Sequence, residues 1–197
     1  MKFPLPLEIV KGRFPVVTQE FGNKSNADWY RANGINIDAH NGTDIVIGGG
    51  RNQAVDTYGC KLVCPTGALL NAVWFDEPMS TKGNGVKVQW NDGRTIKMVV
   101  WHCSECNRQE EYKAGDTLGY IGNSGLVSPK PSYAAVHNGA HLHLMTYIND
   151  VLTDPREVFD FTKWTVSATD TGITKDLPPF QYFLNKIFQS LGLVKTG

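Results

Sequence analysis

The stretch GVKVQWNDGRTIKMVVWH, residues 85–102, decides the fold because apolar and polar side chains alternate on both sides of a short polar turn. A period of two places successive side chains on opposite faces of an extended strand. The Asn-Asp-Gly turn at residues 91–93 can join two such strands, so the pattern predicts an antiparallel β-hairpin. The side chains predicted to share one face of this hairpin are Val86, Val88, Trp90, Ile96, Met98, Val100 and His102.

Short alternating segments separated by Gly and Pro continue on both sides of this hairpin. HLHLMTYI at residues 141–148 alternates again, and KAGDTLGYIGNSG at residues 113–125 is a string of tight turns around short apolar pairs. Helical periodicity is missing from these segments. We therefore expect a mainly β fold with an antiparallel body, either a β-sandwich or a folded sheet.

Two helices are predicted near the end of the chain. DPREVF at residues 154–159 begins with Asp154 as an N-cap and has Pro155 at the first helical position. PPFQYFLNKIFQSLG at residues 178–192 carries an apolar stripe at helical spacing, which can dock on its own domain or on a partner. The predicted division is a domain over residues 1–161, a linker over residues 162–178 and a C-terminal amphipathic helix over residues 179–197.

Charge and hydropathy exclude several classes of partner. The 197 residues contain 19 Lys and Arg against 19 Asp and Glu, so the chain lacks the basic footprint of a nucleic-acid-binding protein. The apolar stretches are shorter than the roughly 20 residues that span a bilayer, and we expect no stable membrane insertion. MKFPLPLEIVKG at residues 1–12 has no continuous apolar core, and we expect no signal peptide in this chain.

Histidine and aspartate residues form three candidate features. His40 and Asp44 lie four residues apart in a Gly-containing turn, His141 and His143 share one face of an alternating strand, and His102 ends the hairpin. Taken singly, these are a solvated loop histidine, a pair of edge-strand histidines and a core histidine. Together they supply His, Asp and His for borderline-soft Zn²⁺ with two histidines to spare. Three protein ligands and an open position are typical of catalytic zinc.

The order of these motifs resembles the lysostaphin/LytM-type zinc endopeptidases, which cut peptidoglycan peptides. The shared order is HxxxD, a strand ending in an aromatic-His pair, Gly-rich turns and then HLH. The resemblance covers roughly residues 17–160 and implies a β fold with a groove. Further segments similar to the family are QEFG (19–22), GCKLVCPTGALL (59–70), KAGDTLGYIGNSG (113–125) and Asp154-Pro155.

The resemblance implies a role for each residue of the candidate features. It makes His40, Asp44 and His143 the zinc ligands. It gives His141 and His102 the handling of protons and of the developing oxyanion, without saying which of the two is the base. The implied function is a zinc-dependent endopeptidase acting on peptidoglycan at the cell wall, reached by export or by delivery from a phage.

One segment departs from the family pattern. Residues 126–140, which precede HLH, are longer than in the family and contain an additional histidine, His137. We expect this loop to border the groove and to influence substrate preference. His137 is interpreted as a loop or substrate-contact residue rather than a ligand.

The four cysteines leave three alternatives open. Cys60 and Cys64 are too far apart to bridge each other along one strand, but strand pairing could bring them near Cys103 and Cys106. Two disulfides, a second and structural zinc site, or four free thiols are each compatible with these positions.

Two other classes of function are weighed against the endopeptidase. A non-catalytic, zinc-bound wall-binding or regulatory module could use the same fold, although this chain keeps all the family's ligand positions. Phosphoryl transfer on a related sheet with paired histidines is the third class, and the HxxxD element has no role in it.

Overall fold

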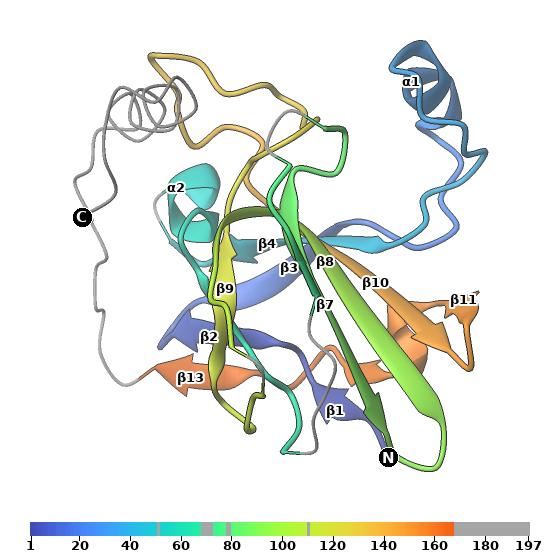
Figure 1. Cartoon of the computed structure of the whole chain (residues 1–197). Coiled ribbons are helices and arrows are strands. Elements are labelled where there is room, and N and C mark those ends of the chain that lie inside the picture. Colours follow the sequence, from blue (N-terminus) through green and yellow to red (C-terminus); the bar gives the residue numbers. More distant parts are fainter. Residues whose placement is uncertain (51, 68–72, 78–79, 110, 168–197) are drawn as a thin grey trace, which may run out of the picture.

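The computed structural model describes residues 1–50, 52–67, 73–77, 80–109 and 111–167 (Figure 1). The predicted C-terminal helix at 179–197 and most of the predicted linker, residues 168–178, lie outside the described residues. Within the described ranges, no helix has the length and apolar character needed to cross a membrane.

The described chain is mainly β, as the sequence predicts. One sheet contains eleven strands, in the order β13-β2-β5-β9-β8-β10-β4-β3, with β7 and β11 paired to β8 and β10 and with β6 paired to β7. Two further strands, β1 and β12, pair with each other. The strands are β1 (Phe3–Pro4), β2 (Leu7–Val10), β3 (Phe14–Gln19), β4 (Thr43–Gly48), β5 (Lys61–Val63), β6 (Val73–Phe75), β7 (Asn84–Asn91), β8 (Thr95–Cys106), β9 (Thr117–Ile121), β10 (Leu142–Ile148), β11 (Val151–Thr153), β12 (Phe159–Asp160) and β13 (Thr165–Ser167).

The predicted hairpin is the antiparallel pair β7 and β8, seen side by side with β10 in Figure 1. Val88 faces Met98 and Trp90 faces Ile96 across the pair, as the alternation predicts. Each of these side chains is at most 4% exposed, because the inner face of the hairpin covers the core. The outward-facing residues of β8 remain half-buried.

Strand β8 connects the two parts of the curled sheet. Its first half pairs with β7 and β10, and after a register shift its last residues pair with β9. A bulge of this kind bends a strand and increases its local twist. The sheet therefore curls around one apolar cluster, to which Phe3 and Phe159 add edge-on and tilted ring contacts with Trp90.

The domain continues past the predicted boundary at residue 161. Strand β13 pairs in parallel with β2, with Thr165 opposite Glu8, and Leu5 N–H donates to the carbonyl of Lys163 at 2.7 Å. The pattern of Thr, Ser and Asp suggested a linker here, but an edge strand that is largely exposed has the same composition.

The helices are short. Asp154 caps its turn as predicted, since its carboxylate accepts from the Arg156 amide at 2.9 Å, but the turn is a 3₁₀-helix of three residues, Pro155–Glu157. The sequence analysis missed α1 (Ala27–Ala32) and α2 (Gln53–Thr57), because helices of five or six residues are too short to show a period of 3.6.

The two faces of β8 predict opposite responses to truncation. Met98 is fully buried, so Met98→Ala should lower the free energy of unfolding by about 2–5 kcal/mol. Its neighbour Val99 faces outward and is half-buried, so Val99→Ala should cost about 1 kcal/mol or less. Urea denaturation of the metal-free variants measures both values, and equal losses would contradict the assignment of the two faces.

Candidate metal centre

Backbone and ring contacts fix the orientation of the His40 imidazole. Its Nδ1 lies 3.2 Å from the carbonyl oxygen of Glu20, and a carbonyl can only accept, so Nδ1 carries the proton. Its Nε2 therefore presents a lone pair to the interior. The ring of Tyr30 stacks on the imidazole at 6.2 Å between centroids, with 7° between the planes.

Sheet register brings the other two predicted ligands together. His143 on β10 faces Asp44 on β4 directly across the antiparallel pair, although the two are 99 residues apart in the chain. His143 Nδ1 lies 2.8 Å from Asp44 Oδ1 and 3.2 Å from His40 Nε2. His40 Nε2 is in turn 3.3 Å from Asp44 Oδ1.

These three atoms form a donor set that fits a metal ion. His40 Nε2 and Asp44 Oδ1 are both acceptors, and they converge on His143 Nδ1, where a single proton would have to serve them both. A cation can take the place of that proton and satisfy all three lone pairs. Two imidazole nitrogens and one carboxylate oxygen suit Zn²⁺. His40, Asp44 and His143 could therefore hold a metal ion, and within the described ranges they are the one such group.

Gly42 leaves the space that His143 occupies. A Cβ at this position would lie 2.7 Å from the carbonyl oxygen of Leu144 and 2.8 Å from His143 Nε2. That nitrogen is buried without a hydrogen-bond partner in the described part of the chain, and it is Nδ1 that lies within 3.2 Å of both other donor atoms. Glycine in the HNGTD segment is therefore a packing requirement of the site.

The two remaining histidines lie beside this group in matching tautomers. His141 Nδ1 donates to the carbonyl of Gly139 at 2.7 Å, and His102 Nδ1 donates to that of Ser124 at 2.8 Å. In the neutral form of each ring, Nε2 is therefore the nitrogen that carries the lone pair and can accept a proton. The two rings lie 4.7 Å apart between centroids, and His141 Nε2 is 3.7 Å from Asp44 Oδ1.

His102 reaches this group through an unusual backbone conformation. The sequence analysis placed its side chain on the core face with Val100, and this is wrong. His102 has a φ of 65°, a left-handed conformation that costs a non-glycine residue roughly 1–2 kcal/mol. The strand alternation breaks at this point, so both Trp101 and His102 contact the ring of His143, at 4.8 and 5.9 Å between centroids. Strain of this kind is common at functional sites.

Burial and mutual contact set the charges of the site. Burial alone would raise the pKa of Asp44, but His141, His143 and His40 together outweigh it and hold that pKa well below its usual range. Burial lowers the pKa of His102 to about 3, helped by the neighbouring His141 and His143. Burial also lowers the pKa of His143, although Asp44 opposes the shift. An ionised carboxylate beside neutral imidazoles is the protonation state that metal binding requires.

Two aromatic residues that pack against the candidate ligands were not predicted from the sequence. Trp101 stacks on His143 with 16° between the planes, and Tyr30 stacks on His40. The aromatic-His pair at the end of the hairpin was a signal for Trp101, whereas no motif marks Tyr30. Both planes restrict the rotation of an imidazole that bears a donor atom.

The other candidate residues lie outside this group. His137 packs against the ring of Tyr58, at 4.6 Å between centroids. All four cysteines are free thiols, so of the three alternatives left open by the sequence the two disulfides are not formed. The sulfur of Cys60 donates to the Glu8 carbonyl and that of Cys64 to the Thr66 carbonyl, whereas Cys103 and Cys106 contact each other. The described residues hold no second group of metal-ligand geometry that includes them.

Comparison with known proteins shows the fold. No family model matches the chain, and no curated protein matches it. A zinc-containing peptidase from Vibrio cholerae is similar in structure, with a TM-score of 0.53 and 17% identity, over 79% of this chain and 39% of that one. The SpoIIQ-SpoIIIAH pore-forming complex contains a similar chain, with a TM-score of 0.51 and 16% identity, over 81% of this chain and 92% of that one. A second structure of the SpoIIIAH and SpoIIQ complex gives 0.50 and 16%, over 79% and 99%.

These similarities confirm the LytM-type fold that the motif order predicts. At 16–17% identity they establish the fold alone, and this chain spans 39% of the length of the Vibrio cholerae peptidase. Because one neighbour is a peptidase and two belong to a pore-forming complex, the fold is compatible with catalysis and with assembly.

Gly42→Ala should weaken metal binding. The added Cβ must displace either His143 or the backbone of β10, so we expect a 10- to 100-fold loss of zinc affinity, on the order of that seen when supporting residues of metal sites are changed. Gly67→Ala is the matched control, because a Cβ there meets nothing closer than Ala114 Cβ at 3.9 Å. Competition titration with a chromophoric chelator measures both, and an unchanged affinity of Gly42→Ala would contradict the packing argument.

The metal-free protein should lose stability as the pH falls below about 6.5. Between pH 6.5 and the folded pKa of His102 near 3, the unfolded chain binds a proton that the folded chain excludes. This contribution is fully present above pH 6.5 and declines by about 2 kcal/mol between pH 6.5 and 4.5. His102→Gln removes this titration, so its unfolding free energy, measured in urea with a chelator, should fall less steeply. Parallel pH profiles for the two proteins would contradict a buried, neutral His102.

Proposed function

We propose that this chain is a zinc-dependent endopeptidase that hydrolyses peptide bonds of bacterial peptidoglycan. The observation that supports this most is the convergence of three potential ligand atoms, His40 Nε2, Asp44 Oδ1 and His143 Nδ1, beside the imidazoles of His102 and His141. A structural metal site uses four protein ligands, whereas three ligands leave a position open for water and substrate. The similarity in fold to a zinc-containing peptidase supports the same proposal.

In the proposed mechanism, three side chains bind the metal ion. His40, Asp44 and His143 would hold Zn²⁺, which when bound polarises a scissile carbonyl and acidifies water. Asp44 brings the one formal negative charge of the donor set, and the hydrogen bond from His40 Nδ1 to the Glu20 carbonyl keeps Nε2 available as a ligand. That bond is the outer support typical of metal-ligating histidines.

The two remaining histidines would move protons. The Nε2 of His141 lies 3.7 Å from Asp44 Oδ1 and has a free lone pair, so it is placed to accept a proton from the attacking water. The low pKa of His102 makes it a weak base near neutral pH, so we assign the base to His141, whose Nε2 lies nearer the candidate ligand Asp44. His102 lies against the ring of His141, and its Nε2 lone pair would stabilise the imidazolium that His141 becomes until that proton passes to the leaving amine.

A second candidate function is a non-catalytic module that binds the wall or a partner protein. It is favoured by the similarity to SpoIIQ-SpoIIIAH structures, which extends over 92–99% of those chains. The complete set of five histidine and aspartate residues favours the enzyme. A zinc-loaded protein that binds purified sacculi and releases no peptide would support the module and contradict the enzyme. Either function places the chain at the cell wall, after export or delivery by a phage.

Three histidine variants separate metal binding from turnover. His143→Ala should lose zinc and the release of peptides from sacculi, because it removes a ligand atom. His102→Gln should keep zinc and lower the rate by about 10²–10⁴-fold, the usual contribution of a proton-handling group. His137→Ala is the control and should keep both, since His137 packs on Tyr58 outside the site. Metal content and mass spectrometry of released peptides measure these outcomes. Wild-type release by His143→Ala would disprove the mechanism.

A further inference from the structure

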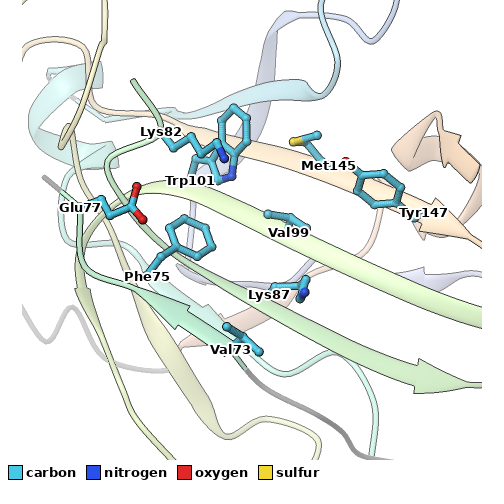
Figure 2. A pocket seen from close by; sticks show the side chains of 9 residues that line it. All are labelled: Val73, Phe75, Glu77, Lys82, Lys87, Val99, Trp101, Met145 and Tyr147. Carbon is cyan, nitrogen blue, oxygen red and sulfur yellow. The ribbon is translucent and has the colours of Figure 1, made fainter. Parts of the chain in front are cut away.

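The sheet face that carries His143 also contains a pocket. Four neighbouring strands, β6, β7, β8 and β10, line a cavity of about 270 Å³ together with Glu77 and Lys82, which lie between β6 and β7 (Figure 2). Of its nine lining residues, three are non-aromatic and apolar, three are aromatic and three are charged. The lining residues are Val73, Phe75, Glu77, Lys82, Lys87, Val99, Trp101, Met145 and Tyr147.

Strand alternation makes this pocket continuous with the candidate metal centre. Met145 and Tyr147 follow His143 at two-residue spacing on β10, so all three lie on one face, while Leu144 and its neighbours fill the core on the other. Trp101 belongs to both regions, because it lines the pocket and stacks on His143 at 4.8 Å. A peptide with its reacting bond at the metal centre would therefore place a neighbouring residue over Trp101 and into this pocket.

The charges of the pocket favour an anion. Lys82 and Lys87 oppose the single carboxylate of Glu77, which leaves a net charge of one positive unit. The Lys82 ammonium lies over the Trp101 ring, 5.8 Å from its centroid, where Figure 2 shows it beside the indole. Neither of the two lysines forms an ion pair with any residue that the structure describes, whereas Lys61 is paired with Glu8 and Lys97 with Asp150.

We propose that this pocket is the subsite for a substrate residue that carries a free carboxylate on a short aliphatic stem, next to the bond held at the metal centre. The proposal rests on the proposed function and deepens it. Val99 and Met145 would contact the apolar stem, and Lys82 and Lys87 would attract the carboxylate. The stem peptides of peptidoglycan offer such groups in a γ-linked glutamate and in a free C-terminus, and amidation neutralises each without changing its shape.

Binding of matched peptides to the metal-free protein tests this proposal without any turnover. The probes are L-Ala-γ-D-Glu-L-Lys-D-Ala-D-Ala, the same peptide amidated at the glutamate α-carboxylate, and the same peptide amidated at the C-terminus. Calorimetry in the presence of a chelator measures their affinities. We expect one of the two amidations to weaken binding about fivefold, the upper range for an exposed ion pair. Equal affinity for all three peptides, or tighter binding of the amidated ones, would overturn the proposal.

Charge variants of the pocket give responses of opposite sign. Lys82→Met and Lys87→Met should each weaken binding of the unamidated, acidic peptide about fivefold. The affinity for the amidated peptide that the wild-type protein binds more weakly should stay unchanged. Glu77→Gln should strengthen binding of the acidic peptide, because it removes the one opposing charge. Lys113→Met is the matched control, since Lys113 is exposed and does not line the pocket. If the lysine variants weaken both peptides equally, the lysines act through shape, and the carboxylate subsite is disproved.

Digestion of purified sacculi by the wild-type protein separates the two proposals. Cleavage of sacculi together with equal affinity for the unamidated and amidated peptides would support the proposed enzyme and disprove the subsite. Selective binding of the acidic peptide without cleavage would support the subsite and disprove the enzyme.

Discussion

The register of β10 between β4 and β8 is the constraint on which both core and site depend. His143 must face Asp44 on one side and Trp101 on the other, and a shift of one residue would turn its side chain into the core. The same shift would expose Leu142 and Leu144, which are fully buried. Apolar burial therefore holds the register, and the register brings together donor atoms from distant segments of the chain. The relative positions of the donor atoms thus depend on the packing of leucines on the opposite face of the sheet.

The candidate metal centre contains two features that cost free energy on folding. It buries an ionised carboxylate near His102 and His143, whose pKa values burial lowers, and it holds His102 in a left-handed conformation. Charged groups out of water are expensive unless they are paired and hydrogen-bonded. A bound cation would compensate Asp44 and satisfy the lone pairs of His40 and His143 at once. Metal affinity and the stability of the fold are therefore coupled through the same few atoms.

The sequence predicts the hairpin and the folded β sheet because period-two burial is a local property, and the resemblance of its motif order to the LytM-type family implies the gathering of the five histidine and aspartate residues. It does not predict contributions that arise only from tertiary packing. The alternation that correctly buries Val100 misplaces His102, since nothing in the sequence reports a positive φ. Tyr30 lies in a short helix without periodicity and joins the site only because its loop folds back onto His40. Strand β13 was taken for a linker because exposed edge strands and linkers share a polar composition.

The two faces of the sheet also differ in how much amino-acid substitution they can tolerate. The side chains that carry the donor atoms are held in place by core-facing neighbours and by Gly42. Substitution of these supporting residues would therefore disturb the packing and the proposed metal binding together. The pocket beyond Trp101 is built from outward-facing residues and from Glu77 and Lys82, and among its lining residues only Met145 is buried. Its charge and shape can therefore vary without loss of the fold. Trp101 is the exception, because it contacts His143 and lines the pocket, so a change there would alter the orientation of a candidate metal ligand and the shape of the proposed subsite at the same time.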